Sequence, residues 1–312
     1  MAERVLVTGA LGCLGAWVAR CVLDDGDVVV GYDLGDNRSR LELVLGGDEP
    51  RVEMVRGDIT DLAAVERVLD EHEITRVVHL AALQVPFVRA NPPLGMHVNV
   101  AGTVNVFDAV SRRLDRIPNV TYASSTAVYN SDDPCPAPET GGTRPTTLYG
   151  VSKLADEGIA RIYHADAGVP SIGLRPYVVY GPGRDQGMTS GPTVAIAAAL
   201  RGEPYEIGYS GSAQYDFAPD VARAVVQAAH AAAGTAAVYN VPGAVADMAV
   251  VVACIEAEIP DAEITWAGAP LPFPPELEAV RYDREVGTFP RTPLADGIAA
   301  TVAHFRRTPT AG

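Results

Sequence analysis

The sequence has no long hydrophobic run. Its longest apolar stretches, such as Val194 to Leu200, are too short to cross a bilayer. The first residues, Met1-Ala2-Glu3-Arg4, lead directly into an apolar segment and lack the layout of a secretory signal peptide. We therefore expect a cytoplasmic protein with no membrane partner.

Cysteine is also scarce. The 4 cysteines are dispersed along the chain. They are Cys13, Cys21, Cys135 and Cys254. None forms a CxxC pair or a Cys/His cluster with metal-ligand spacing, so we expect reduced thiols and no metal site.

Basic residues are outnumbered: 24 lysines and arginines face 39 acidic residues, for a formal charge of −15. Such a charge repels nucleic acid, so any bound phosphate must be held by groups at its own binding site, since the protein has no general positive field. The 312 residues are 48% apolar and 20% charged, which suits a globular protein with a large core. We see no internal repeat. One large domain or two unequal ones is expected.

Short apolar runs alternate with stretches of helical periodicity. The runs lie at 5–8, 28–32, 52–55, 77–80, 120–123 and 172–175, and the helical stretches after the first lie near 61–73, 99–113 and 148–167. The first helix follows the glycine-rich turn after residue 8 and passes through Trp17, Val18, Cys21 and Val22. This alternation predicts an α/β fold with a Rossmann-type, doubly wound parallel sheet.

The pattern loosens after residue 176. Proline and glycine become frequent at 181–192 and 268–275, between helical candidates near 193–201, 220–232, 247–258 and 294–306. We interpret residues 1–176 as a Rossmann domain that binds NAD. Residues 177–312 are then mostly a smaller substrate-binding lobe, with some segments returning to the main sheet. Ligands of such folds lie beyond the carboxyl ends of the strands.

A glycine-rich loop, Thr8-Gly9-Ala10-Leu11-Gly12-Cys13-Leu14-Gly15, joins the first strand to the first helix. Gly9 permits a tight turn, Gly12 lets backbone amides approach a pyrophosphate, and Gly15 lets helix and strand pack closely. Alone, this triplet is weak support, because a plain turn can carry it. Its place between a strand and a helix N-terminus favours a dinucleotide site.

Asp33 ends the second strand, about 20 residues after the glycine-rich loop. A carboxylate at this spacing can bind the ribose hydroxyls and reject a 2′-phosphate. This favours NAD over NADP. The alternative rests on Arg38 and Arg40 just downstream, which could accept that phosphate.

Tyr149-Gly150-Val151-Ser152-Lys153 places a phenol and an ammonium four residues apart, on one face of a helix. A phenol has a reference pKa of about 10, but a nearby cation favours the phenolate. Tyr149 can then take a proton from a substrate hydroxyl. The motif is short, and its ordinary interpretation is a half-buried tyrosine with a solvated lysine.

The TGxxGxxG spacing and the Tyr149/Lys153 pair resemble the extended short-chain dehydrogenase/reductase family of NAD-dependent epimerases and dehydratases, whose members include UDP-galactose 4-epimerase. The resemblance implies that Ser125 hydrogen-bonds the reacting oxygen and that Ser125, Tyr149 and Lys153 are catalytic. It also implies a homodimer, for which the helices near 99–113 and 148–167 are candidate faces.

The resemblance continues through Gly57-Asp58-Ile59, His79-Leu80-Ala81-Ala82, Asn99-Val100-Ala101-Gly102 and Leu174-Arg175-Pro176-Tyr177-Val178-Val179. The cofactor-binding residues it implies, together with those already named, are Gly9, Gly12, Cys13, Leu14, Gly15, Asp33, Asp58, Ile59, Leu80, Ala81, Ala82, Asn99, Ser124, Tyr149, Lys153, Tyr177 and Val179. Without the family, Asp58 is a simple strand-end cap and Asn99 a polar residue inside a helix.

The substrate is less well specified. Two positions that grip a diphosphate in nucleotide-sugar epimerases, an asparagine and an arginine, align with Val178 and Tyr215. The Asp-Glu pair of dehydratases is replaced by Thr126-Ala127, which disfavours elimination of water. The candidate substrate contacts are Gln84, Ser125, Thr126, Arg184 and Tyr215.

Three functions remain open. The first is an epimerase acting on a secondary alcohol of a carbohydrate-like substrate, which could be a nucleotide sugar with inversion at C4. The second is an NAD-dependent dehydrogenase of a free sugar, sugar acid or other small hydroxy compound. The third is a non-catalytic dinucleotide sensor, disfavoured because Ser125, Tyr149 and Lys153 are all present.

Overall fold

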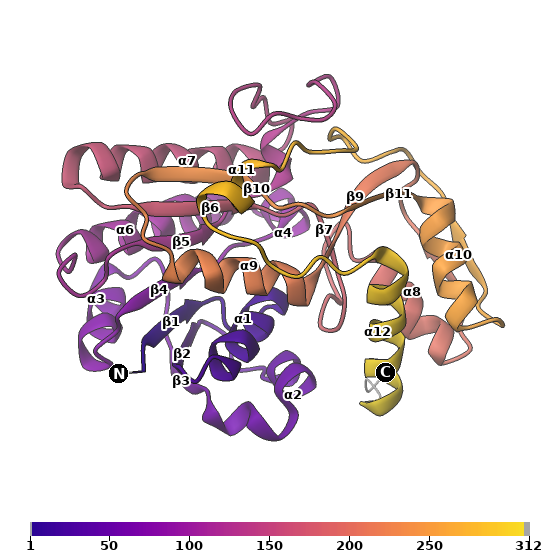
Figure 1. The fold of residues 1–312 in the computed structure, drawn as a ribbon, viewed down its shortest axis with the longest axis horizontal. Coiled ribbons are helices and arrows are strands. Elements are labelled where there is room, and N and C mark those ends of the chain that lie inside the picture. Colours follow the sequence, from indigo (N-terminus) through magenta and orange to yellow (C-terminus); the bar gives the residue numbers. More distant parts are fainter. Residues whose placement is uncertain (1, 309–312) are drawn as a thin grey trace.

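The computed structural model describes residues 2–308, and its centre is a seven-stranded parallel sheet (Figure 1). In spatial order the strands are β10 (Ala236–Asn240), β6 (Ser171–Arg175), β5 (Val120–Ala123), β4 (Arg76–His79), β1 (Arg4–Thr8), β2 (Val28–Asp33) and β3 (Glu53–Arg56). The chain starts in the middle of the sheet and winds first to one edge and then to the other. The expected doubly wound α/β fold is thereby confirmed.

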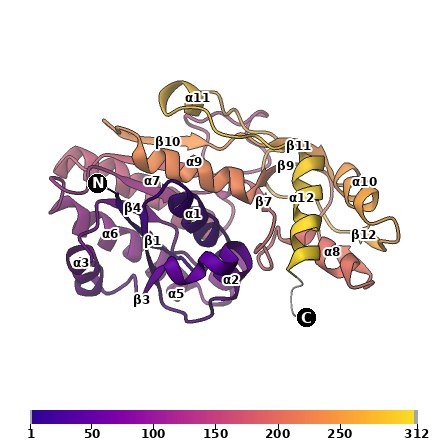
Figure 2. The same ribbon diagram turned by 60° about the horizontal axis from the view of Figure 1, so that its bottom comes forward.

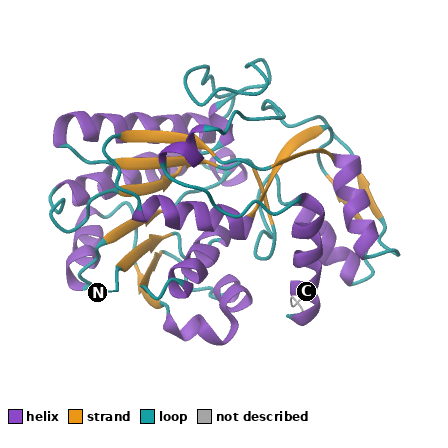
Figure 3. Cartoon of the chain, in the orientation of Figure 1, coloured by secondary structure: helices purple, strands orange, loops and turns teal. Residues whose placement is uncertain are grey.

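Helices cover both faces of this sheet (Figure 3). One layer consists of α1 (Cys13–Asp24), α2 (Ser39–Leu45), α9 (Ala218–His230) and α11 (Arg281–Glu285), and the other of α3 (Leu62–Glu71), α6 (Gly102–Ser111) and α7 (Leu148–Ala167). Side chains of β1 alternate between the two cores, Val5 and Val7 in the first and Leu6 in the second. This alternation explains why the buried strands are continuously apolar.

A smaller lobe lies at one end of the sheet (Figure 2). It contains the three-stranded sheet β11-β9-β7, formed by β7 (Val178–Tyr180), β9 (Ser212–Phe217) and β11 (Ala244–Asp247), and the pair β8 (Tyr205–Ile207) and β12 (Ile264–Trp266). Its helices are α8 (Gly191–Leu200), α10 (Met248–Glu258) and α12 (Leu294–Arg307). Buried Ile196, Ile255 and Ile298, one from each helix, share a core with β9.

Two segments after residue 177 belong to the main sheet. Helix α9 packs on α1, and β10 pairs with β6. The helix expected at 99–113 is divided into a π-helical turn, His97–Ala101, and α6. Two short helices that the sequence pattern did not predict, α4 (Val85–Ala90) and α5 (Pro92–Met96), precede this turn. Among residues 2–308, no helix is both long and apolar enough to cross a membrane.

Candidate active site

A cavity of about 610 Å³ opens beyond the carboxyl ends of the main-sheet strands, between the sheet and the lobe. Its volume falls within the range of roughly 300–1,000 Å³ that small-molecule sites occupy. Of the residues expected in the site, those that line the cavity are Gly9, Gly12, Cys13, Leu14, Gly15, Asp33, Asp58, Ile59, Leu80, Ala81, Ala82, Gln84, Ser124, Ser125, Thr126, Tyr149, Lys153, Tyr177, Val179 and Arg184. Asn99 and Tyr215 lie outside its lining.

The glycine loop forms the floor of one end of the cavity. Gly9 has a φ of +71°, and a Cβ there would lie 2.8 Å from the Ala81 amide nitrogen. A Cβ on Gly15 would lie 2.2 Å from the Gly9 carbonyl oxygen. Side chains at these positions would either strain the turn or push α1 off it. The loop is thus a backbone cradle in front of the N-terminus of α1, which fits the pyrophosphate of a dinucleotide.

Asp33 stands at the end of β2, on the cavity wall. Its Oδ2 accepts a hydrogen bond from the Leu11 amide at 3.0 Å, and its Oδ1 accepts one from the Gly35 amide at 3.1 Å. Each carboxylate oxygen keeps a lone pair for a ligand hydroxyl. These two acceptors fit the hydroxyls of the adenosine ribose of NAD.

The two arginines near Asp33 are already engaged. Arg38 pairs with Glu49. Arg40 lines the cavity, but it holds Asp185 through Nε and Nη2, the latter at 2.7 Å, and donates to the Leu11 carbonyl at 3.1 Å. A 2′-phosphate would have to compete with the Asp185 carboxylate for Arg40, which supports the preference for NAD.

The Arg40–Asp185 ion pair also ties down residues 181–190, which we call the strap. The strap follows β7 and contributes several residues to the cavity wall, Arg184 and Gln186 among them. At its start, the Pro182 carbonyl accepts a hydrogen bond of 2.9 Å from the Trp17 indole N–H of α1. The strap therefore joins the lobe to the glycine loop and its helix.

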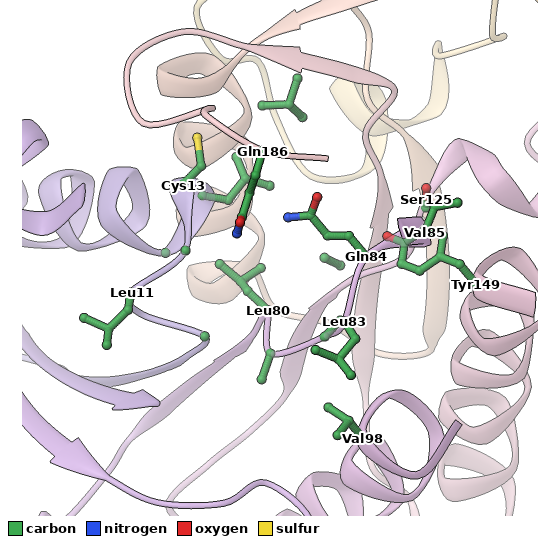
Figure 4. A pocket seen from close by; sticks show the side chains of 18 of the residues that line it. Leu11, Cys13, Leu80, Leu83, Gln84, Val85, Val98, Ser125, Tyr149 and Gln186 are labelled. Atoms are coloured by element: carbon green, nitrogen blue, oxygen red, sulfur yellow. The ribbon is translucent and has the colours of Figure 1, made fainter. Parts of the chain in front are cut away.

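Tyr149 is presented by the first turn of α7. The Thr147 side chain caps this helix by accepting a hydrogen bond from the Gly150 amide at 3.0 Å. A Cβ on Gly150 would lie 2.0 Å from the Ala127 carbonyl, so glycine alone lets α7 approach the turn that follows Ser125 so closely. Both Ser125 and Tyr149 line the cavity, and Figure 4 shows them at the same end of it.

Lys153 lies one helical turn beyond Tyr149 and is 4% exposed. Its Nζ donates to the Ala123 carbonyl at 2.9 Å and to Asp156 Oδ2 at 3.2 Å, and lies 6.0 Å from the centre of the Tyr149 ring. Burial would lower the pKa of Lys153, but Asp156, together with smaller contributions from Tyr149 and Glu157, raises it above its ordinary value. Lys153 is thus held as an ammonium beside the phenol.

Asn99 acts on the site through the backbone. Its Oδ1 accepts from the Leu83 amide at 2.7 Å, and its Nδ2 donates to the Leu83 carbonyl at 3.0 Å and to Ser152 Oγ at 3.1 Å. Asn99 is fully buried in the π-helical turn, so it does not reach the cavity. It ties the loop after β4 to α7. This placement differs from the direct cofactor contact expected from the sequence.

The substrate end of the cavity is mostly uncharged. Gln84 extends toward the centre of the cavity (Figure 4). The Thr126 hydroxyl donates a hydrogen bond to the Pro176 carbonyl at 3.1 Å. Arg184 contacts Thr189 Oγ1 at 3.3 Å and has no carboxylate partner in the described chain. It is the lining cation most available to an anionic group.

Tyr215 differs from its expected role as a substrate contact. It lies on β9, is 2% exposed and packs in the core of the lobe. Its partner in the parallel ladder is Val178 of β7, so the two positions that would carry diphosphate contacts are neighbours on one sheet. Both are buried and uncharged. No charge-assisted contact to a diphosphate can come from either position.

Sequence reasoning missed several lining residues. Leu83, Val85, Gln186, Met188 and Phe273 all line the cavity. Phe273 comes from the proline-rich segment between β12 and α11, and no local pattern shows that this segment folds back over the sheet. Within residues 2–308, no cluster of three His, Cys, Asp or Glu side chains could hold a metal ion.

The model of the NAD dependent epimerase/dehydratase family matches residues 5–241. A UDP-glucose 4-epimerase from Mycolicibacterium smegmatis is 32% identical over 97% of this chain and 98% of that protein. UDP-glucuronate 4-epimerase 2 from Arabidopsis thaliana is 36% identical over 57% of this chain, and the match spans only 42% of that plant protein's length.

A solved structure also matches nearly the whole chain. The UDP-glucose 4-epimerase of Thermus thermophilus, solved as a complex with NAD, superimposes with a TM-score of 0.84. That match covers 98% of this chain and 100% of the Thermus chain at 26% identity.

Proposed function

Because this chain belongs to the NAD-dependent epimerase/dehydratase family of extended short-chain dehydrogenases/reductases, we propose that it is a nucleotide-sugar 4-epimerase. One observation carries the proposal: the glycine loop, Asp33, Ser125, Tyr149 and Lys153 all line a single cavity. The relative that matches nearly the whole chain is a UDP-glucose 4-epimerase. NAD, when bound, supplies the hydride acceptor.

The side chains divide the remaining work. Tyr149 takes the proton from the substrate hydroxyl, and Ser125 donates a hydrogen bond that holds the reacting oxygen. Lys153 stabilises the phenolate by its charge and presents its remaining N–H toward the cavity. Asp33 and the cradle of the glycine loop hold the cofactor at the other end. The positions of these residues along the cavity wall support this division.

Replacing Tyr149 with phenylalanine tests the assignment of the base. Tyr149→Phe removes only the hydroxyl, so turnover is expected to fall by about 10²–10⁴-fold. NAD binding, measured by calorimetry, should remain nearly unchanged. Val151→Ala, on the same turn of α7 and pointing away from the cavity, is the control. A Tyr149→Phe enzyme that retained most of its activity would rule out Tyr149 as the base.

A second candidate is a net dehydrogenase of a small hydroxy substrate. The uncharged pair Val178 and Tyr215 favours it, because neither residue can grip a diphosphate. Arg184 would then bind a single anionic group such as a carboxylate.

One assay separates the candidates. Purified protein is denatured and its released NAD is measured, and native protein is then incubated with UDP-sugars, free sugars and sugar acids. Retained NAD and interconversion of UDP-sugars without net NADH support the epimerase. Steady NADH formation from a small substrate supports the dehydrogenase. NAD binding without turnover of any substrate would leave the sensor.

We further propose a homodimer formed through α7 and its neighbours. Leu148, Val151 and Ile162 of α7 are 40–48% exposed and lie along one side of the helix. Phe87 of α4, which is 43% exposed, extends this apolar surface, because α4 contacts α7. Helix α6 shows no exposed large apolar side chain, so α7 is the better candidate face.

We also propose a cytoplasmic location. All four cysteines are free thiols, and Cys135 is exposed. A reducing compartment preserves such thiols. Subcellular fractionation would test this location.

A further inference from the structure

Asp156 is a buried carboxylate that the function described so far does not use. It lies on α7, three residues after Lys153, and is 1% exposed. Its Oδ2 lies 3.2 Å from Lys153 Nζ, whereas its Oδ1 is buried and has no hydrogen-bond partner among the described residues. An ionised carboxylate is costly in such surroundings unless a cation compensates for it. Lys153 is that cation.

The contacts of Lys153 hold its ammonium so that it faces the cavity. Its ammonium has three donors, and two of them are used by the Ala123 carbonyl and Asp156. Asp156 does not line the cavity, whereas Lys153 does. The ammonium is therefore anchored from behind, and its third N–H is left for the cavity. A lysine chain has many rotamers, so this anchor selects the useful one.

Other charges around the pair do not replace Asp156. Glu157, the adjacent carboxylate, is held by Arg175 at 2.7 Å through both Nε and Nη2 and accepts a hydrogen bond from Ser124. Its charge is thus compensated by Arg175.

The remaining groups that face the pair are uncharged. His79 of β4 faces Lys153, and burial lowers its pKa to about 3, so it is neutral. Thr103 of α6 offers only a hydroxyl, and it donates that hydroxyl to the Asn99 carbonyl at 2.6 Å. Tyr149, on the preceding turn of α7, is the group on which Lys153 acts.

We propose that Asp156 is a positioning residue that keeps Lys153 charged and oriented inside the buried site, and that it thereby sets the pH at which Tyr149 can act as a base. The proposal rests on the role proposed above for Tyr149. Without Asp156, the only carboxylate left to oppose the burial of Lys153 is Glu157, which is already paired with Arg175, so the ammonium loses its proton at a lower pH. A neutral amine cannot stabilise the phenolate, and Tyr149 then requires a higher pH to lose its proton.

The test compares Asp156→Asn with the wild-type enzyme across pH. Asparagine keeps the shape and can still accept a hydrogen bond but carries no charge. The ascending limb of the profile of kcat/KM against pH is expected to move up by about one unit or more, the size of a close charge effect. Asp156→Glu should restore part of the wild-type profile. Asp166→Asn, an exposed change on the same helix, is the control.

The direction of the shift distinguishes two roles. If Asp156 only damped the charge of Lys153, removing it would move the limb down. An unchanged limb would mean that Asp156 is merely structural. Either result overturns the proposal. Thermal melts and NAD content check that the asparagine variant folds and binds the cofactor.

A second measurement needs no substrate. The tyrosinate absorbance of the protein is titrated with and without Tyr149→Phe, and the difference isolates Tyr149 among the 12 tyrosines. The same pair of titrations on Asp156→Asn should show this difference signal at a higher pH. If the epimerase assignment fails, this titration still reports on Lys153 and Asp156, so the two failures are distinguishable.

Discussion

At the scale of single residues, Asp33 does two kinds of work. It organises the cavity by accepting backbone amides from Leu11 in the glycine loop and from Gly35 in the loop after β2. In the function proposed above, its remaining lone pairs bind the ribose of the cofactor. Its carboxylate repels a 2′-phosphate at the same time. Asp33 therefore favours NAD over NADP together with the Arg40–Asp185 pair.

Replacing Asp33 with alanine removes both effects. Asp33→Ala is expected to weaken NAD binding by about 10- to 100-fold, because hydrogen bonds to a charged group contribute about 1.5–3 kcal/mol. NADP binding should weaken less, so the dissociation constant of NADP divided by that of NAD falls. Calorimetric titration of both cofactors measures this ratio. Glu42→Ala, an exposed change of the same charge on α2, should leave it unchanged. An unaltered ratio in Asp33→Ala would refute the ribose assignment.

At the scale of elements, α7 brings both Tyr149 and Lys153 to the cavity. Its cap at Thr147, its close approach at Gly150 and its buried pair Lys153–Asp156 lie within three turns. The helix therefore needs to be placed accurately against the turn after Ser125. The 2.0 Å gap between a Cβ on Gly150 and the Ala127 carbonyl shows how closely the two segments pack.

Gly150→Ala tests this placement. The added methyl group must push α7 away from Ala127, which is expected to cost about 1–3 kcal/mol of unfolding free energy. Activity should fall by about 100-fold, because a displacement near 1 Å is that costly in an active site. Gly158→Ala is a matched control on the same helix, since its added methyl group meets no atom within 4 Å. That variant should be slightly more stable and fully active. Thermal melts and initial rates measure both variants.

The sequence predicts the parts of the site that are contiguous in the chain. The glycine loop and the Tyr149/Lys153 pair each follow from a few adjacent residues, and both line the cavity. Phe273 could not be predicted, because it reaches the cavity through a long irregular segment. Tyr215 aligned with a phosphate grip, but its ladder position faces the core of the lobe. Asn99 was expected at the cofactor, and the π-helical turn directs it to Leu83 and Ser152.

At the scale of the whole molecule, the cavity and the apolar face of α7 lie on different sides of that helix. Tyr149 and Lys153 line the cavity, whereas Val151 and Ile162 are exposed. A partner molecule on this face would stiffen the helix without blocking the cavity.

A charged substitution on this face tests the dimer. Val151→Asp with Ile162→Asp is expected to convert the protein to a monomer, because two desolvated carboxylates would face their own copies. Light scattering after size exclusion measures the mass. Val250→Asp on α10, at a valine that is 50% exposed, should leave the assembly unchanged. A wild-type protein that is monomeric at micromolar concentration would refute the proposed homodimer.

The contact between Trp17 and the strap affects the fluorescence of the protein. Trp17 is one of 2 tryptophans, and its indole N–H is bonded to the Pro182 carbonyl at the start of the strap. The other, Trp266, lies on β12 in the lobe. Indole emission responds to hydrogen bonding and to solvent, so a change in the Trp17–Pro182 hydrogen bond would alter the emission of Trp17, and a Trp266→Phe variant would isolate that signal. The fold thus carries a built-in fluorophore at the joint between lobe and glycine loop, and this fluorophore reports on the joint without an added label.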